Sequence, residues 1–327
     1  MSPSDQTSLS HAARRGRLVP RRSRLRSEAI VRKTLFGTAL LSVGTTGAII
    51  VVLALEAISF FALPDHPEIS LVGFATGTEW SPLLGAEPKF GVLPLVCGTL
   101  LITGIAALVA LPIGLVTSVF LSEYAPGWLR TPVKAILELL AGVPTVVYGF
   151  FALTFITPDI LQRVSRWVTG DEVFGTYNAL SAGIAVGIMI LPIICSLSED
   201  ALRAVPRSLR DGAYALGGTK FDTSVRVVLP AALSGIVAAF LLAVTRAIGE
   251  TMIVALAAGS VPSLTLDPAS QSQTMTGYMV QIFLGDAPAG GVEYQSAYAV
   301  AATLFLITLV LAWVGGLVLR RFREEYE

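Results

Sequence analysis

The chain has 327 residues, of which 54% are hydrophobic and only 14% are charged, and its mean hydropathy is +0.72. Soluble domains carry about 25% charged residues, so this composition argues against a water-soluble globular protein. The formal net charge of +0 conceals nine Lys and Arg residues within the first 33 positions. Two cysteines in apolar surroundings exclude a disulfide framework and any cysteine metal site of recognisable spacing.

The first 33 residues form a basic segment ahead of the first apolar stretch. We expect residues 1–33 to be a disordered cytoplasmic arm that lies on anionic lipid, with partner or nucleic-acid binding as the lesser alternative. The apolar stretch that follows is too long for a cleaved secretory signal, and no small-residue cleavage site closes it. It is therefore interpreted as an uncleaved signal anchor.

Six apolar stretches are long enough to cross a hydrocarbon core about 30 Å thick. They cover about 35–62, 93–122, 134–157, 179–197, 231–259 and 296–319. Nineteen of the 23 Lys and Arg residues fall in the two tails and in the loops 123–134 and 198–230, whereas the opposite loops hold three. Because Lys and Arg are retained in the cytoplasm, the sequence predicts an all-α polytopic membrane protein with both termini on that side.

Residues 272–284, between the fifth and sixth spans, carry apolar side chains near helical spacing. This pattern predicts a short amphipathic helix at the outer membrane interface, with a packed loop as an equal alternative. The outer segments also hold ten acidic residues, but none of them follows the spacing of a metal-ligand cluster. No metal site is predicted.

The cytoplasmic segment 198–230 is longer and more regular than a simple connection. Three arginines recur at helical spacing on one face and three apolar residues on another, namely Arg203, Arg207, Arg210, Leu209, Ala213 and Leu216. Pro206 is typical of a helix start, and Gly217 with Gly218 of a helix end. We expect a helix of about ten residues that inserts into a partner. A surface helix without a partner is the alternative.

This segment resembles the motif of ABC-importer permeases, E-A-A-x3-G-x9-I-x-L-P. The match in chain order is Asp211, Gly212, Ala213, Gly217, Val227, Leu229 and Pro230. Every spacing is kept, while Asp, Gly and Val replace Glu, Ala and Ile. In that family the segment carries the helix that couples the permease to a cytoplasmic ATPase. The resemblance therefore implies ATPase coupling by Arg207, Arg210, Asp211, Gly212, Ala213, Gly217, Leu229 and Pro230.

Two more segments narrow the resemblance to the permeases of phosphate-specific transport (Pst) systems. They are residues 138–149, ELLAGVPTVVYG, and residues 246–254, RAIGETMIV. The outer stretch with Trp80, Pro82 and Phe90, together with Met252, resembles the C subunit more than the A subunit. The resemblance covers about residues 35–320. It implies that residues 34–327 form a permease domain of type I importer (MetI-like) architecture that imports phosphate.

The same resemblance implies partners in a bacterial plasma membrane. They are a homologous A-type permease, a homodimeric cytoplasmic ATPase that binds ATP and Mg, and an extracytoplasmic phosphate-binding protein. The chain itself has no G-x4-G-K-[ST] motif and no recognisable nucleophile–base pair, so no catalytic residue and no cofactor are expected in it. An enzyme is accordingly not predicted.

A basic residue, Arg246, lies near the middle of the fifth span. Translocon scales put a charge there at about 2.5–3.5 kcal/mol, which is tolerated where the group faces the bundle interior, a partner or water. Glu250 follows four residues later, and on a continuous helix it shares a face with Arg246 and can neutralise it. A guanidinium offers phosphate a planar fork of donors. We predict a substrate pathway at Arg246, Glu250 and Thr251; an ion pair that only locks helices is the alternative.

Gly142 and Pro144 are expected to bend the third span near its middle, a common feature beside a translocation path. Thr145 and Tyr148 complete the predicted pathway, with ordinary interhelical hydrogen bonds as their alternative role. Two other functions remain open: a permease for another oxyanion such as sulfate or molybdate, and a membrane scaffold or sensor component that transports nothing. The cost of burying Arg246 argues against the scaffold.

Overall fold

The computed structural model describes residues 22–63, 69–82, 88–285, 288 and 290–321, most of which are helical. Within these residues five helices are long and apolar enough to cross a membrane, and a bent pair brings the number to six. The predicted all-α polytopic architecture is thereby confirmed. The described residues divide into two compact units, one before and one after the boundary between Ala54 and Leu55.

The first long helix, α2 (Arg22–Phe61), runs for 40 residues without interruption. The expected disordered arm is therefore wrong for residues 22–33, which belong to this helix. The physical reason is local, because residues 22–36 contain neither Pro nor Gly and are rich in the helix formers Arg, Leu and Ala. Residues 1–21 of the expected arm lie outside the described residues.

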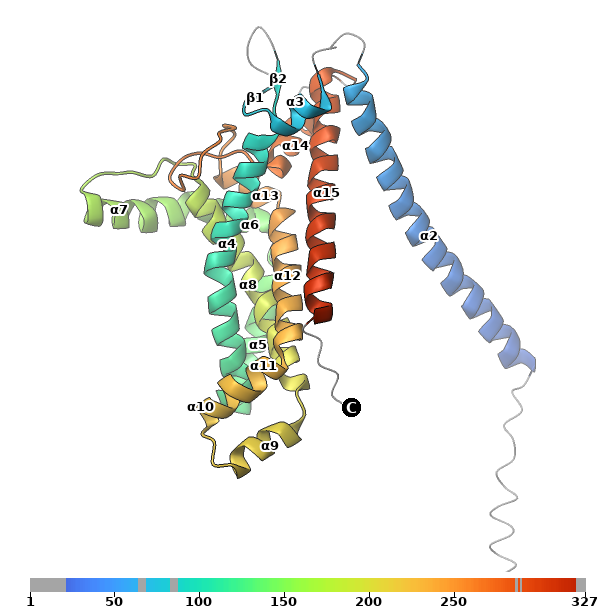
Figure 1. The fold of residues 1–327 in the computed structure, drawn as a ribbon, viewed down its shortest axis with the longest axis vertical. Helices are drawn as coiled ribbons and strands as arrows, with labels where there is room; N and C mark the ends of the chain where they lie inside the picture. Colours follow the sequence, from blue (N-terminus) through green and yellow to red (C-terminus); the bar gives the residue numbers. More distant parts are fainter. Residues whose placement is uncertain (1–21, 64–68, 83–87, 286–287, 289, 322–327) are drawn as a thin grey trace, which may run out of the picture. The chain divides into compact units, whose positions relative to one another are not determined.

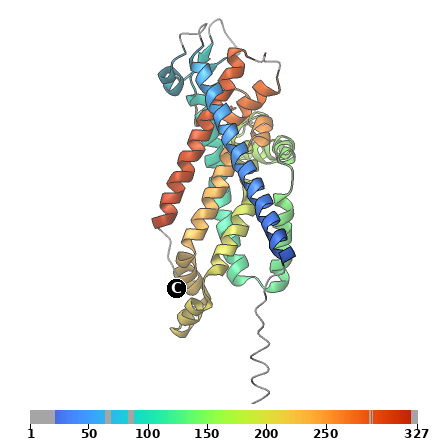
Figure 2. The same ribbon diagram turned by 90° about the vertical axis from the view of Figure 1, so that its right-hand side faces the viewer.

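Four helices run side by side in the second unit (Figures 1 and 2). They are α4 (Leu93–Val119), α8 (Ala179–Ala204), α12 (Leu233–Ile248) and α15 (Val292–Arg321). Small residues allow α4 and α8 to approach closely, as membrane helices commonly do. A Cβ on Gly183 of α8, for example, would stand only 2.6 Å from the side chain of Ile105 on α4.

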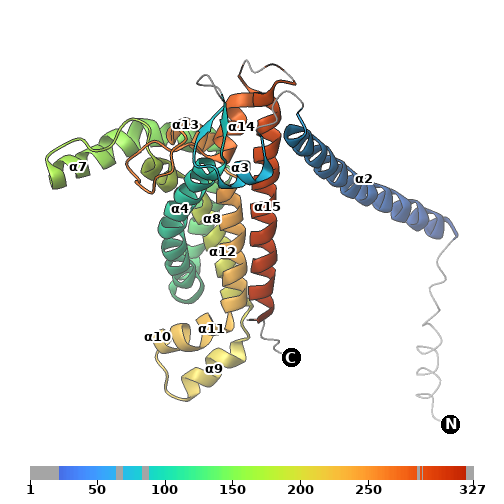
Figure 3. The same cartoon turned by 45° about the horizontal axis from the view of Figure 1, so that its top comes forward.

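The third apolar segment is broken where Gly142 and Pro144 predict a bend. In chain order it comprises α5 (Gly127–Ala141), α6 (Thr145–Phe151), the π-helical stretch η2 (Ala152–Leu161) and α7 (Gln162–Thr169). Pro144 has no N–H group and disfavours a helical residue before it, which ends α5. The predicted span 134–157 is wrong in its bounds, because the continuous helical run is Thr145–Thr169. Its last part, α7, projects sideways from the bundle (Figure 3).

The fifth apolar segment is also broken, and here no bend was predicted. The helix α12 ends at Ile248, and the short helix α13 (Met252–Ala257) begins four residues further on. A second bend of 68° separates Lys220–Ala231 from Leu233–Ile248. The continuous span expected over 231–259 is therefore wrong.

One end of the second unit, which we call the α9 end, is built from short helices (Figure 1). They are η1 (Phe120–Tyr124), α9 (Arg207–Ala215), α10 (Lys220–Thr223), η3 (Ser224–Val228) and α11 (Leu229–Ala231). The surface helix expected between Pro206 and Gly217 is confirmed as α9. Gly217 follows it with a φ of +85°, a left-handed conformation that glycine adopts without strain.

The opposite end, the hairpin end, contains two short helices and a small antiparallel sheet (Figure 1). Its elements are α3 (Leu71–Thr76), β1 (Trp80–Ser81), β2 (Lys89–Phe90) and α14 (Met275–Phe283), with Trp80 paired to Phe90. The helix predicted within 272–284 is thus confirmed as α14. Met275, Tyr278 and Ile282 of α14 are buried in an aromatic-rich cluster, so this helix packs into the protein.

Candidate functional site

Glu250 organises the link between α12 and α13. Its side-chain Oε1 accepts hydrogen bonds from the backbone N–H groups of Met252 at 3.1 Å and Ile253 at 3.3 Å. Its backbone carbonyl accepts a hydrogen bond from the Thr276 hydroxyl of α14 at 2.6 Å. The side chain thus satisfies the first free N–H groups of α13, as a capping residue does. Glu250 is 6% exposed, so it is a buried structural carboxylate in this chain.

Arg246 is exposed on α12, one helical turn after the exposed Leu242. Among the described residues Arg246 and Glu250 form no ion pair, and the predicted pair is wrong. The i,i+4 argument requires a continuous helix, but α12 ends at Ile248 before it reaches Glu250. The guanidinium therefore faces the surface of this chain, next to a break in an apolar helix.

The broken helix that contains α5 and α6 lies directly against the one that contains α12 and α13, because α6 contacts α13. A Cβ on Gly149 of α6 would stand 2.9 Å from Leu256 Cδ1 and 3.2 Å from the Cα of Ile253, so glycine permits this contact. The buried Tyr148 donates its hydroxyl to the carbonyl of Leu140 at 2.8 Å, across the break between α5 and α6. Tyr148 is thus engaged in a structural hydrogen bond.

The two threonines predicted for the pathway lie at the first turns of these short helices. Thr145 is the first residue of α6 and is half-buried. Thr251 precedes α13, is half-buried and donates its hydroxyl to the carbonyl of Gly249 at 3.2 Å. The structure therefore brings the predicted pathway residues to two neighbouring helix breaks. Their contact with a substrate stays a prediction.

At the α9 end, Arg210 connects α9 to the bundle. Its Nη2 lies 2.9 Å from Glu123 Oε1, and its Nε donates to Glu123 Oε2 at 3.4 Å. The same guanidinium donates to the carbonyls of Val205 at 2.6 Å and Leu202 at 2.8 Å, at the end of α8. The side chains of Arg210 and Glu123 are 16% and 6% exposed. Arg210 therefore anchors the helix and does not point outward from it.

A second buried carboxylate, Glu199, lies at the end of α8 and is 1% exposed. It pairs with Arg130, with Lys134 Nζ at 3.2 Å and with Arg203 Nη1 at 3.7 Å. Burial works to lower the pKa of Lys134, but hydrogen bonds to Asp200 and Glu199 outweigh it and raise that pKa. Sequence reasoning missed both Glu123 and Glu199. The available signal was an acidic residue at the end of each apolar stretch, close to the basic residues of the next loop.

The outward surface of α9 carries Ser208, Asp211 and Gly212, all exposed, with Arg207 at its first turn. The predicted apolar stripe is wrong at Leu216, which is 92% exposed, whereas Leu209 packs on a buried cluster that includes Leu202 and Val205. Leu216 lies beyond the last residue of α9, so helical spacing does not apply to it. Arg203 belongs to α8 and not to α9.

The remaining residues of the predicted coupling motif make contacts within α9 or with the buried cluster beneath it. Ala213 is half-buried, and its carbonyl accepts a hydrogen bond from Gly218 N–H at 3.0 Å. Leu229 packs against the buried cluster beneath α9, and Pro230 occupies the first turn of α11, where its missing N–H costs nothing. A cation–π contact of 4.9 Å between Lys220 and the Tyr124 ring adds a link from α10 to η1.

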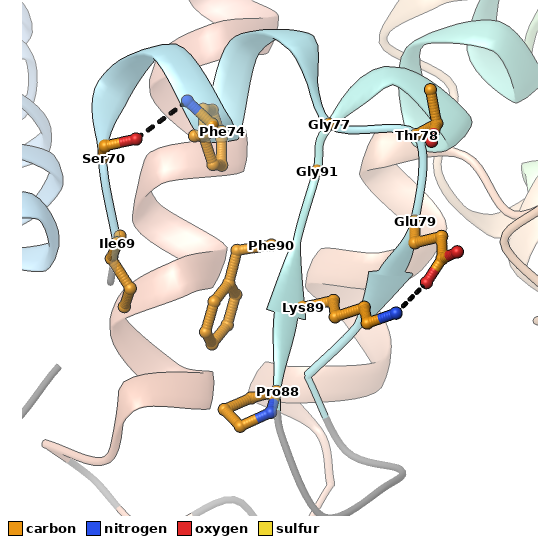
Figure 4. A pocket seen from close by; sticks show the side chains of 11 residues that line it. Ile69, Ser70, Phe74, Gly77, Thr78, Glu79, Pro88, Lys89, Phe90 and Gly91 are labelled. Atoms are coloured by element: carbon orange, nitrogen blue, oxygen red, sulfur yellow. Dashed lines mark hydrogen bonds and ion pairs between the residues drawn. The ribbon is translucent and has the colours of Figure 1, made fainter. Parts of the chain in front are cut away.

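The hairpin end contains a pocket of about 340 Å³ between α3 and the two strands. Figure 4 shows Phe74 and Phe90 at this pocket and the side chains of Lys89 and Glu79 pointing toward each other across the hairpin, where they form an ion pair. The backbone of Gly77 touches that of Gly91, because a Cβ on Gly77 would stand 2.6 Å from the Cα of Gly91. This pocket holds none of the residues predicted for the substrate pathway.

The fold and these sites define a helical membrane permease with broken helices in its bundle and a surface helix at one end. Residues 110–324 match the family described as "Binding-protein-dependent transport system inner membrane component". The chain belongs to this family. It is a multi-pass inner-membrane protein and the permease component of an ABC importer.

Several relatives cover most of this chain. A probable ABC transporter permease protein, YqgH of Bacillus subtilis, is 33% identical over 92% of this chain and 92% of its own length. The phosphate transport system permease protein PstC of Xylella fastidiosa is 33% identical over 78% and 80%. PstC 1 of Mycobacterium bovis is 36% identical over 73% and 79%.

Solved structures agree on the fold. A bacterial alginate ABC transporter in complex with an alginate-bound periplasmic protein aligns with a TM-score of 0.64 at 15% identity, covering 91% of this chain and 96% of that chain. An inward-facing MetNI methionine ABC transporter aligns with a TM-score of 0.55 at 20% identity, covering 71% and 96%. The expected type I importer (MetI-like) architecture is confirmed.

Proposed function

We propose that this chain moves inorganic phosphate into the cytoplasm as one permease subunit of an ATP-driven importer. Relatives that cover most of the chain are named as phosphate transport permeases, which supports phosphate as the substrate. The chain forms the translocation path together with a homologous A-type permease. A homodimeric ATPase binds ATP and Mg, and an extracytoplasmic binding protein delivers the anion. No cofactor and no catalytic step belong to this chain.

The observation that carries this proposal is the exposed Arg246 on an apolar helix. A charged group within a membrane span is costly unless it faces a partner, a polar cavity or water. Arg246 has no ion-pair partner among the described residues, so its donors are available to an anion. A guanidinium stays charged at any physiological pH and holds two phosphate oxygens at once. Arg246 is therefore the proposed transient ligand.

The break that follows Arg246 and the neighbouring break between α5 and α6 complete the proposed path. Broken helices expose backbone dipoles to an ion in the middle of a membrane, and α6 packs against α13. Thr145 and Thr251 supply hydroxyl groups at these breaks, whereas Glu250 and Tyr148 act as positioning residues through their hydrogen bonds. Because Glu250 turns its Oε1 to the backbone N–H groups of α13 and forms no ion pair with Arg246, the guanidinium stays available to an anion.

Coupling to the ATPase is assigned to α9. Its exposed residues Ser208, Asp211 and Gly212 form the proposed docking surface, and Arg207 borders it. Arg210 transmits movement of α9 to the bundle through Glu123 and the end of α8. The α9 end and both termini lie in the cytoplasm in this proposal, as the distribution of Lys and Arg indicates.

The proposal is tested in proteoliposomes that contain the assembled complex and its binding protein. We expect phosphate to stimulate ATP hydrolysis and to accumulate inside in an ATP-dependent manner. Arg246→Gln is expected to lower uptake by about tenfold or more, which corresponds to about 1.4 kcal/mol or more of lost anion stabilisation. Arg246→Lys restores uptake only in part, because an ammonium is a point charge without a fork of donors.

Leu242→Ala is the matched control, since Leu242 lies on the same exposed face one turn earlier. It is expected to leave uptake near the wild-type level, and all variants must copurify with the other subunits. Stimulation by sulfate or molybdate in place of phosphate would establish the other-oxyanion alternative. A complex that assembles but accumulates no anion would establish the scaffold.

A further inference from the structure

A polar pocket of about 210 Å³ lies at the α9 end, lined by residues of η1, α5, α8 and α9. Its lining residues are Ser122, Glu123, Arg130, Arg203, Arg207 and Arg210. Four of these six residues carry a guanidinium group. The volume far exceeds the roughly 10–15 Å³ that a single water requires, so a small polyatomic ion fits.

The carboxylates near this arginine pocket are already engaged. Glu123 is buried and holds Arg210 through both of its oxygens. Glu199 is buried beneath the pocket and is shared by Arg130, Lys134 and Arg203. Arg207, in contrast, is exposed and forms no ion pair with any residue that the structure describes. Guanidinium groups therefore outnumber the carboxylates that contact them.

Arg130 lines the pocket with its charge only partly satisfied. Its Nε is buried and has no hydrogen-bond partner among the described residues, although Arg130 pairs with Glu199 through its Nη2. Buried donors in folded proteins are almost always hydrogen-bonded. Glu199 Oε1, on the carboxylate that pairs with Arg130, is likewise buried without a hydrogen-bond partner among the described residues, so this ion pair does not use all the hydrogen-bonding groups beside the pocket. Tetrahedral oxyanions suit the pocket because several guanidinium forks can share their oxygens.

We propose that the arginine pocket binds a phosphate group from the cytoplasmic side, as inorganic phosphate or as the headgroup of an anionic phospholipid. Arg207 and Arg210 belong to α9, whereas Arg130 and Arg203 belong to α5 and α8. A bound phosphate group therefore ties the coupling helix to the bundle. The proposal depends on the proposed function only for the side of the membrane on which the pocket lies.

The test uses the full chain in phosphatidylcholine nanodiscs, where both faces are accessible. Phenylglyoxal modifies accessible arginines, and mass spectrometry gives the modification rate of each one separately. We expect inorganic phosphate to slow modification of Arg207 by about tenfold relative to chloride at equal ionic strength, equivalent to about 1.4 kcal/mol of protection. Arg226 is the internal control, because it is 80% exposed in the same loop and does not line the pocket.

A second arm replaces phosphatidylcholine by phosphatidylglycerol and omits inorganic phosphate. Protection of Arg207 in this arm alone would identify the lipid headgroup as the source. The variant Arg203→Gln is expected to abolish protection in either arm while the basal modification rate of Arg207 stays unchanged, and Arg226→Gln is expected to keep it. Equal slowing at Arg207 and Arg226, or protection in neither arm, would overturn the proposal.

The variant Arg246→Gln separates this proposal from the proposed function. Arg246 lies on α12 and does not line the arginine pocket, so the variant is expected to retain full protection of Arg207 by phosphate. A chain that loses transport but retains protection would leave the pocket intact as a site. Loss of protection in Arg246→Gln would show that Arg207 responds only to anion bound on the pathway, and it would also overturn the proposal.

Discussion

Two buried carboxylates fix the segments around them at the scale of single residues. Glu250 ends one helix and begins the next by accepting hydrogen bonds from Met252 and Ile253. Glu123 holds Arg210, which also donates to the end of α8. In both cases a charged group is stable in the interior because it is paired or hydrogen-bonded. Losing one partner leaves the other without compensation.

Arg210→Ala is therefore expected to destabilise the chain strongly. Removing one member of a buried ion pair costs about 3–5 kcal/mol, because the remaining charge is uncompensated. The carbonyls of Leu202 and Val205 lose their donor as well. Thermal unfolding in nanodiscs measures the loss. Arg226→Ala, which removes an 80% exposed arginine from the same loop, should unfold as the wild type does, and an equal loss there would contradict the assigned role of Arg210.

A double-mutant cycle at Arg246 and Glu250 tests the geometry of the helix break. The effects of two substitutions on the free energy of unfolding add within about 0.3–0.5 kcal/mol when the two residues do not interact. We therefore expect the effects of Arg246→Gln and Glu250→Gln to be additive. Glu250→Ala should cost about 1–3 kcal/mol, because it leaves buried N–H groups unsatisfied. Unfolding of the two single variants and the double variant gives the coupling. A coupling well above 1 kcal/mol would mean that the ion pair forms after all.

At the scale of elements, the sequence predicted helices more reliably than it predicted their breaks. Pro144 ends α5 by a local rule, so the bend in the third segment was predictable. Gly249 alone did not predict the break before α13, because a single glycine is tolerated inside membrane helices. That break depends on the Glu250 side chain and on Thr276 of a distant helix, which no local pattern reveals.

The same distinction between local and distant sequence signals applies to the candidate sites. Helix α9 and its end just before Gly217 were predictable from turn residues and from the motif, since both signals are local. The inward direction of Arg210 was not, because its partner Glu123 lies 87 positions earlier. The predicted ion pair between Arg246 and Glu250 was wrong for a related reason, because helical spacing was applied across a break in the helix.

The hairpin end offers a test of close packing between elements. A Cβ on Gly77 would stand 2.6 Å from the Cα of Gly91, and one on Gly91 would stand 2.3 Å from the backbone carbon of Gly77. Gly77→Ala is therefore expected to cost about 1–3 kcal/mol of stability through overpacking. Gly104→Ala on α4 is the control, because a Cβ there meets nothing within 4 Å and alanine favours a helix. Equal melting temperatures for the two variants would contradict this packing.

At the scale of the whole molecule, the two ends of the second unit differ in charge. Basic residues of the α9 end are Arg130, Lys134, Arg203, Arg207, Arg210, Lys220 and Arg226. The hairpin contributes only Lys89. Several of the seven are bound to buried carboxylates, but the positive-inside rule counts Lys and Arg and gives acidic residues little weight. The charge distribution that predicts the orientation of the chain therefore also builds the arginine pocket.

This asymmetry predicts the orientation in the membrane. A membrane-impermeant maleimide is expected to label Ser208→Cys, on the exposed face of α9, in inverted vesicles and not in intact spheroplasts. Thr78→Cys, exposed at the hairpin end, is expected to give the opposite result. The unaltered chain sets the background, since Cys195 is buried and Cys97 half-buried. Labelling of Ser208→Cys from the outside would reverse the assigned topology, and α9 would then lie on the wrong side of the membrane to meet an ATPase.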